Sequence, residues 1–229
     1  IVDRPLEKNG LELESARANM ELVVEDDTAE RSEKKMIMQS KAIDGSVRTL
    51  VELTHPEDLK GQSFLFAENE SGEDDVWMYV PAFEVTRRIE GSKKQGAFLG
   101  SHFTYNDLES RDVEEATYTK KGDEKVGKHP VHVIRATPKD SAESAYGKIR
   151  VYVRKSDDVP LRMKFFDDSG ELVKTLYVRK VDETASGRTY IKQMQMHSAK
   201  GGYTLLTIRG LETDVDLPAS AFNKEQLGK

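Results

Sequence analysis

The sequence contains no cysteine. This absence excludes disulfides, zinc sites built on cysteine and thiol nucleophiles. No stretch approaches the roughly 18 consecutive apolar residues of a membrane-spanning helix. A glycine-rich phosphate loop, an H-E-x-x-H zinc motif and a G-x-S-x-G serine elbow are also missing. We therefore expect no catalytic residue, no metal site and no cofactor, and we do not interpret the chain as an enzyme.

The composition describes an acidic chain with enough apolar residues for a core. The 229 residues are 37% hydrophobic and 33% charged, with a net charge of −6 and a mean hydropathy of −0.64. An acidic balance argues against a nucleic-acid partner, because phosphate binding depends on clustered cations. The length suits one large β domain or two small domains.

Histidines and paired aspartates are the remaining candidates for chemistry. The five histidines are His55, His102, His129, His132 and His197. His129 and His132 lie three residues apart in a strand-like run, so they face opposite sides and cannot share a metal. The aspartate pairs, such as Asp157-Asp158, fall at expected turns, where aspartate bonds backbone N–H groups. Histidines that are exposed or hydrogen-bonded, and aspartates that form turns, are the better interpretation.

Strand patterns dominate the chain. Met20, Leu22 and Val24 alternate with Glu21, Val23 and Glu25, which is the period of a half-buried strand. Asp44-Gly45 between two such runs predicts a tight hairpin. Similar runs recur every 10 to 15 residues up to residue 209, separated by Gly, Pro, Asp and Ser. Helix is scarce, and the candidates are residues 6–18, short turns within 96–108, and residues 218–227.

The fold class that follows is mainly β: a single curved antiparallel sheet of about 10 to 11 strands with a few short helices. A closed barrel, a half-barrel and a two-sheet sandwich give the same pattern, so the periodicity alone does not choose among them.

Residues 74–108 are the most informative part of the chain. We expect one strand from residue 74 to residue 88, with a tight step at Val80-Pro81-Ala82. W-x-Y-x-P-A begins at Trp77, R-R-I at Arg87 and F-x-G-S-x-F-x-Y-x-D-L at Phe98. These motifs, in this order, resemble the family of outer-membrane lipoprotein-sorting proteins related to LolA. The resemblance implies an unclosed half-barrel whose apolar concave face is covered by helices, with residues 1–229 forming one lipid- or lipoprotein-binding domain.

The resemblance also implies a function and a location. It implies a periplasmic carrier or chaperone that holds lipoprotein acyl chains, or another envelope lipid, during transfer toward the outer membrane. An inner-membrane transporter would donate the cargo and an outer-membrane acceptor would receive it. We expect a monomer, exported by a signal peptide that has been removed, since residue 1 is Ile. The alternative is an RseB-like envelope-stress sensor that acts through a protein partner.

Seven methionines are the compositional sign of such a site, because thioether side chains adapt to irregular apolar partners. By composition alone they would fill an ordinary core, and the resemblance favours a cavity. The lipid-binding candidates are Met36, Met38, Phe64, Phe66, Trp77, Tyr79, Phe98, Leu99, Phe103, Tyr105, Met163, Phe165, Met194 and Met196.

Residues 96–108 would cover the cavity, either as a mobile lid or as a fixed plug. Arg87 and Arg88 are adjacent in a strand, so one of them must face inward. An inward arginine on an apolar wall needs hydrogen-bond partners. We expect the inward arginine either to latch the lid or to bind a lipid head group. The alternative is that both arginines are ordinary cations at a strand edge.

Overall fold

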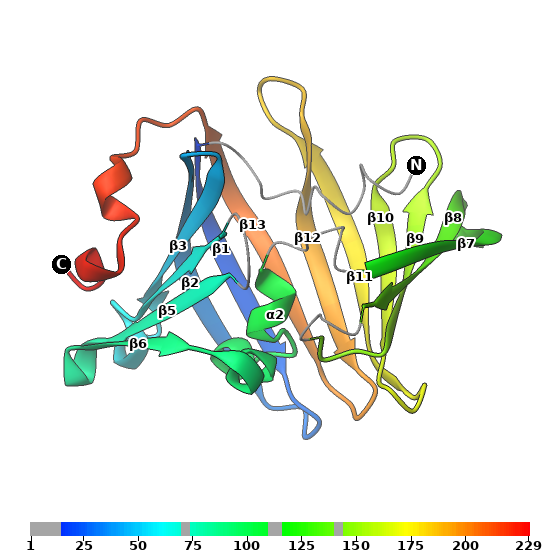
Figure 1. Ribbon diagram of the computed structural model, residues 1–229, viewed down its shortest axis with the longest axis horizontal. Coiled ribbons are helices and arrows are strands. Elements are labelled where there is room, and N and C mark those ends of the chain that lie inside the picture. The colour runs from blue at the N-terminus through cyan, green and yellow to red at the C-terminus, as the bar shows by residue number, and fades with distance from the viewer. Residues whose placement is uncertain (1–14, 70–73, 110–115, 140–143) are drawn as a thin grey trace.

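One antiparallel sheet organises the protein in the computed structural model, which describes residues 15–69, 74–109, 116–139 and 144–229. Thirteen strands follow the order β6-β5-β4-β3-β2-β1-β13-β12-β11-β10-β9-β8-β7. The sheet curves strongly, and its two edge strands, β6 and β7, do not pair with each other (Figure 1). The expected mainly-β, unclosed half-barrel is confirmed.

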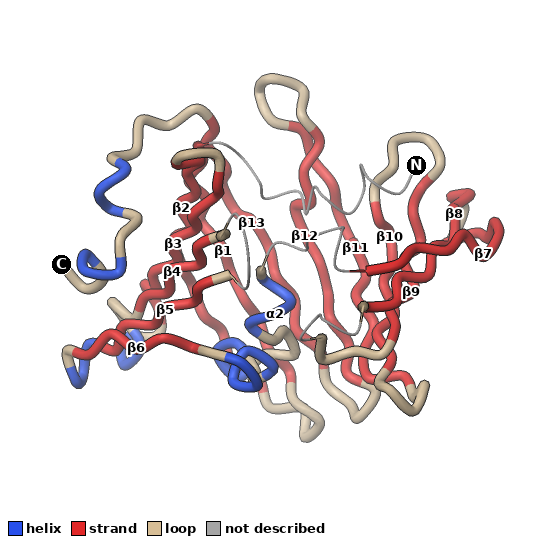
Figure 2. The backbone as a smooth tube through the Cα atoms, in the orientation of Figure 1, coloured by secondary structure: helices blue, strands red, loops and turns tan. Residues whose placement is uncertain are grey.

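Long hairpins make up most of the sheet. The strands are β1 (Ser15–Glu25), β2 (Arg31–Ile43), β3 (Ser46–His55), β4 (Ser63–Ala67), β5 (Asp75–Val80), β6 (Val85–Ile89), β7 (Ala116–Val126), β8 (His129–Pro138), β9 (Lys148–Arg154), β10 (Pro160–Phe166), β11 (Leu172–Glu183), β12 (Thr189–Ser198) and β13 (Tyr203–Thr213). Figure 2 shows how little helix accompanies them. None of the helices in the described ranges is long and apolar enough to cross a membrane.

The hairpin expected at Asp44-Gly45 is confirmed. Ile43 pairs with Ser46, so the loop has only two residues. Asp44 and Gly45 both have positive φ angles, 51° and 86°. A two-residue loop with this backbone matches the twist of the flanking strands, and Asp-Gly adopts it readily.

The strand count exceeds the expected 10 to 11, partly because residues 74–88 form a hairpin and not one strand. A 3₁₀ turn, Pro81–Phe83, reverses the chain between β5 and β6. Glu84 then adopts a left-handed φ of 52°. The reversal brings Arg88 opposite Trp77. A left-handed backbone conformation is uncommon for glutamate. Because position 84 is not a glycine, the sequence does not indicate this turn.

Two helix predictions are wrong. Residues 15–18 of the expected N-terminal helix belong to β1, and residues 6–14 lie outside the described residues. The expected helix at 218–227 consists of two short 3₁₀ turns, Ala219–Ala221 and Lys224–Gln226.

The two faces of the sheet are covered differently. The C-terminal segment lies on the convex face, where Phe222 and Leu227 pack with Leu65, Trp77 and Tyr79. On the concave face lies a larger core that includes side chains from β1 to β4, from β8 to β13, and from residues 98–108. In Figure 1, α2 (Tyr105–Leu108) lies in front of this concave face. Any internal site is therefore on the concave side.

Candidate functional site

A cavity of about 160 Å³ lies between the concave face and residues 98–109. Its wall is almost entirely apolar. The lining residues are Met20, Leu22, Met36, Met38, Val47, Thr49, Val51, Phe66, Phe98, Phe103, Asp107, Leu108, Glu109, Pro160, Met163, Phe165, Leu176, Val178, Ile191, Met194, Met196 and Leu206. The strand residues belong to β1 to β4 and β10 to β13, so the cavity spans both halves of the sheet.

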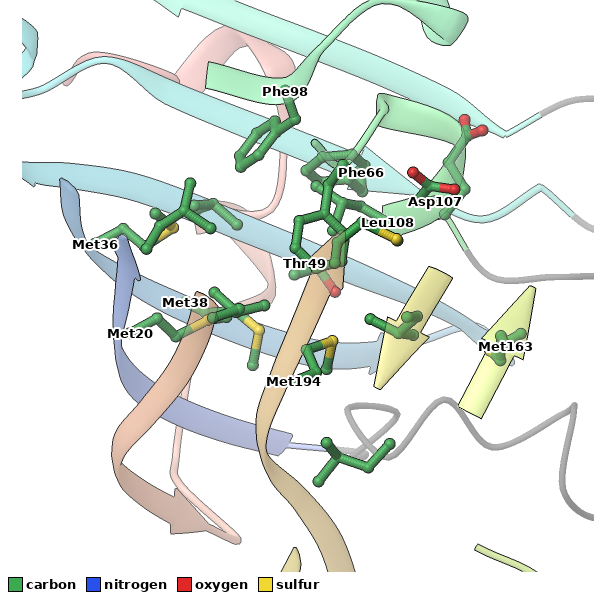
Figure 3. Close-up of a pocket in the computed structure, with 18 of the residues that line it drawn as sticks. Met20, Met36, Met38, Thr49, Phe66, Phe98, Asp107, Leu108, Met163 and Met194 are labelled. Carbon is green, nitrogen blue, oxygen red and sulfur yellow. The ribbon is translucent and has the colours of Figure 1, made fainter. Parts of the chain in front are cut away.

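Methionine is the commonest residue in this wall. Six of the seven methionines of the chain line the cavity, and Met78 is the exception. They are brought together by register: Met20 pairs with Met36 across β1 and β2, and Val178 pairs with Met194 across β11 and β12. Figure 3 shows the labelled methionines around the cavity, together with Phe98 and Leu108. Such a wall can change shape around a guest, because thioether side chains are flexible and polarisable.

A short irregular segment closes the concave side. This covering segment (residues 91–109) comprises two 3₁₀ helices, Gly91–Gln95 and Phe98–Gly100, followed by α2. Phe98 is its aromatic anchor: its ring lies 5.0 Å from that of Phe64 and 5.6 Å from that of Tyr105, both edge-on. Such ring pairs contribute about 0.5–1.5 kcal/mol beyond their buried area.

One buried ion pair fastens the covering segment to the sheet. Lys174 Nζ of β11 lies 2.5 Å from Asp107 Oδ2 of α2, and only 6% and 3% of the two side chains are exposed. Lys174 also donates to the carbonyl of His102 at 3.3 Å. Tyr146 donates its hydroxyl to Asp107 Oδ1 at 3.0 Å. Because the pair is desolvated and hydrogen-bonded on both sides, removing one partner alone would be costly.

Asp107 has a second role in starting α2. Its carboxylate accepts a hydrogen bond from the backbone N–H of Thr104, and the Thr104 hydroxyl accepts one from the backbone N–H of Asp107. This reciprocal pair is a capping box, which stabilises the first turn of a helix. The same carboxylate therefore shapes the covering segment and ties it to the sheet.

A second buried pair lies within the covering segment itself. Lys94 Nζ is 2.7 Å from Glu109 Oε1 and donates to the carbonyl of Asp74 at 2.6 Å. Burial, with a smaller contribution from the nearby Glu109 and Glu68 carboxylates, raises the pKa of Asp74 to about 6. A carboxyl group that titrates near pH 6 therefore lies beside this end of the covering segment.

The structure brings most of the predicted lipid-binding residues together. Nine line the cavity: Met36, Met38, Phe66, Phe98, Phe103, Met163, Phe165, Met194 and Met196. Phe64, Leu99 and Tyr105 belong to the surrounding core but do not line the cavity. Trp77 and Tyr79 lie on the opposite, convex face against the C-terminal segment, because they alternate with Val76 and Met78 along β5. These two residues are therefore not part of the candidate site.

The expected latch at the arginine pair is wrong for Arg88. Its side chain faces outward, bonded to Asp75 at 2.7 Å and to Glu90 at 2.8 Å, with its guanidinium 5.9 Å from the Trp77 ring. Arg87 is exposed and lies opposite Met78, outside the cavity lining, so its head-group role stays a prediction.

The cation that fastens the covering segment is Lys174, which we did not predict. Its position in β11 carried a signal. Lys174 is in phase with Leu176 and Val178, which both line the cavity, so the period of two predicts that it faces inward. No group of three or more side chains suited to a metal occurs within the described ranges.

One family model and several solved structures match the chain. A family model described as an uncharacterized protein matches residues 45–229. A search of curated proteins found no match. Among solved structures, an outer membrane lipoprotein-sorting protein domain from Vibrio parahaemolyticus has a TM-score of 0.91 and 29% identity, over 100% of this chain and 97% of that one.

Two further structures are similar. A DUF1329 family protein from Desulfovibrio piger has a TM-score of 0.90 and 25% identity, over 96% of this chain and 94% of that one. A LolA superfamily protein from Nitrosomonas europaea has a TM-score of 0.77 and 19% identity, over 99% and 97%. At that identity the last similarity shows the fold alone.

Proposed function

The chain belongs to the LolA-like family of outer-membrane lipoprotein-sorting proteins, and from this premise we propose that it is a carrier that holds an acyl chain in the methionine-lined cavity. The observation that carries the proposal is the cavity itself: an apolar space of about 160 Å³ beneath a short covering segment. Among the described residues of its wall, the charged ones are Asp107 and Glu109, and each is held in an ion pair. The proposed activity is binding and release.

The driving force would be the transfer of hydrocarbon out of water. Each buried CH₂ group contributes about 0.8 kcal/mol, so a ten-carbon chain would gain roughly 8 kcal/mol before the costs of association. An apolar cavity of similar size, about 150 Å³, is known to bind benzene. The cavity as it stands therefore suits a short hydrocarbon segment. A longer acyl chain requires the methionines to repack or the covering segment to move.

The cellular role follows from the family and is part of the proposal. The protein would work in the periplasm as a single domain, take its cargo from an inner-membrane transporter and give it to an outer-membrane acceptor. An acyl chain cannot remain exposed while it crosses this aqueous compartment, because the transfer cost above would favour aggregation. The candidate contacts are the nine predicted residues that line the cavity, with Met20 and Leu206 added by the structure.

Two methionine variants test the proposal. Met194 and Met78 are both half-buried, but only Met194 lines the cavity. Met194→Asp places a carboxylate in the proposed acyl site, while Met78→Asp places the same charge beside the core and outside the cavity. Binding would be measured by displacement of the neutral fluorophore N-phenyl-1-naphthylamine with decanol. Stability would be measured by urea denaturation.

We expect Met194→Asp to abolish probe uptake and Met78→Asp to keep it, even where both variants lose similar stability. Phe98→Asp, which alters the covering segment, should behave like Met194→Asp. Equal loss of uptake and stability in Met194→Asp and Met78→Asp would mean that Met194 is an ordinary core residue. Wild-type protein that binds neither the probe nor decanol would refute the carrier proposal.

A further inference from the structure

The two buried ion pairs of the covering segment differ in which part of the molecule holds their charges. Lys94 and Glu109 both belong to the covering segment, so the two charges would move together if the segment moved. Lys174 belongs to β11, whereas Asp107 belongs to α2. Moving the covering segment away from the sheet would therefore leave the Lys174 ammonium behind without this carboxylate.

The surroundings of Lys174 make that separation expensive. Lys174 is 5% exposed, and its Nζ lies 5.1 Å from the centre of the Tyr146 ring and 5.5 Å from that of the Phe165 ring. Aromatic faces attract a cation, but they do not replace a carboxylate. Breaking a buried ion pair by removing one partner is strongly destabilising, because the remaining charge is uncompensated in a medium of low dielectric.

Lys174 is also placed beside the cavity. It lies opposite Phe165 in the register of β10 and β11, and Phe165 lines the cavity. Asp107, its present counter-ion, lines the cavity as well. A group that entered the cavity and displaced Asp107 would therefore meet the Lys174 ammonium next.

From this arrangement we infer that the carrier selects acyl ligands with an anionic head group, such as a carboxylate or a phosphate, which takes the place of Asp107 on Lys174. The inference rests on the proposed function, since it names the ligand class of the same cavity. The head group restores the charge balance that opening removes, so the ligand binds the open state in preference to the closed one. Differential affinity of this kind is what shifts such an equilibrium.

A neutral ligand with the same tail gains the same hydrophobic burial but does not compensate Lys174. Decanoate and decanol form such a matched pair, and at pH 8 the carboxylate is ionised. Displacement of N-phenyl-1-naphthylamine by each ligand gives two affinities, and their ratio reports the charge preference independently of the tail. The variants would be Asp107→Asn, the double variant Lys174→Gln/Asp107→Asn, and the control Lys192→Gln/Asp182→Asn, which removes an ion pair between β11 and β12 outside the cavity lining.

The double variants leave no unpaired buried charge at the altered pair, which protects folding, and circular dichroism would verify the fold. We expect wild-type protein to prefer decanoate. Asp107→Asn should bind decanoate more tightly still, because the internal competitor has lost its charge. Lys174→Gln/Asp107→Asn should lower the decanoate-to-decanol affinity ratio about tenfold or more, the size of one charge-assisted hydrogen bond. The control pair should leave the ratio unchanged.

An unchanged ratio in Lys174→Gln/Asp107→Asn would overturn the inference while leaving the acyl-carrier proposal intact. A loss of the ratio in the Lys192→Gln/Asp182→Asn control to the same extent would also overturn it, since the preference would then not come from Lys174. Failure of both ligands to displace the probe from wild-type protein would overturn the inference together with the proposed function.

Discussion

Phe98→Ala tests whether the covering segment moves independently of the sheet. The Phe98 side chain is 4% exposed and packs against the rings of Phe64 and Tyr105. Truncating a core phenylalanine to alanine costs about 3–5 kcal/mol. If the segment opens as a unit, about 3 kcal/mol of this cost falls on its docking and raises the opening constant roughly 100-fold, since 1.4 kcal/mol corresponds to a factor of about ten.

Amide hydrogen exchange measures this opening directly. The His102 N–H donates to the Thr204 hydroxyl of β13 at 2.9 Å, so this hydrogen bond joins the covering segment to the sheet and its amide reports on opening. We expect exchange of the His102 amide to accelerate roughly 100-fold in Phe98→Ala, with much smaller changes in the backbone amides of β1 and β13. The association rate of decanol should rise in the same variant.

The matched control is Phe222→Ala. Phe222 is fully buried, at 0% exposure, but it lies on the convex face. Its truncation should lower the free energy of unfolding without a selective effect on the covering segment. If Phe98→Ala accelerates exchange in β1 and β13 as strongly as in the covering segment, the segment is a fixed plug and the reasoning fails.

Two further substitutions have defined outcomes. Thr104→Ala removes half of the capping box at α2 and should cost about 1 kcal/mol, seen as a roughly fivefold faster exchange of the covering segment with little change in ligand selectivity; unchanged exchange would contradict the role of this cap. Asp74→Asn concerns the carboxyl group whose pKa is raised to about 6. A carboxyl group whose pKa is raised by folding stabilises the folded protein at pH values below its ordinary pKa. This contribution to the free energy of unfolding is lost as the pH rises through about 6. Relative to wild type, Asp74→Asn should therefore gain about 1 kcal/mol between pH 4 and pH 8, after allowance for solvent screening; urea denaturation at both pH values checks this, and a pH-independent difference would contradict it.

Much of the sheet could be predicted from the sequence, because each strand shows one face to a core. The period of two located the strands, and Asp44-Gly45 located a two-residue hairpin. The turn at residues 81–84 was missed for a physical reason. Pro81 fits an extended segment, and nothing in the sequence signals the left-handed conformation of Glu84. The pattern therefore predicts one strand where the structure has two, β5 and β6.

Which face a strand residue occupies was harder to predict than the strand itself. Phe64 and Phe66 face the concave core, while Leu65 between them faces the C-terminal segment. Trp77 lies opposite Leu65 in the register of β4 and β5, so it shares the convex face. An aromatic residue satisfies either face, because both are covered, and only the pairing register decides between them.

The ion pair that holds the covering segment to the sheet was also difficult to predict from the sequence. Two adjacent arginines in a strand, Arg87 and Arg88, form a conspicuous local pattern, and the sequence therefore favours them as the latch. The buried cation is Lys174, and its partner Asp107 lies 67 positions away in the sequence. Periodicity predicts that Lys174 faces inward, but only the fold shows which carboxylate meets it. Pairs that are distant in the sequence are decided by topology, which local patterns do not encode.

The most direct test of the account is native mass spectrometry of the protein purified without detergent from a bacterial envelope, in parallel with its Met194→Asp variant. We expect the wild-type protein to carry an additional mass equal to an acyl lipid, recovered by solvent extraction, and the variant to carry none. Wild-type protein with only its bare mass, before and after incubation with acyl lipid, would contradict the central claim that the concave cavity receives a hydrocarbon guest.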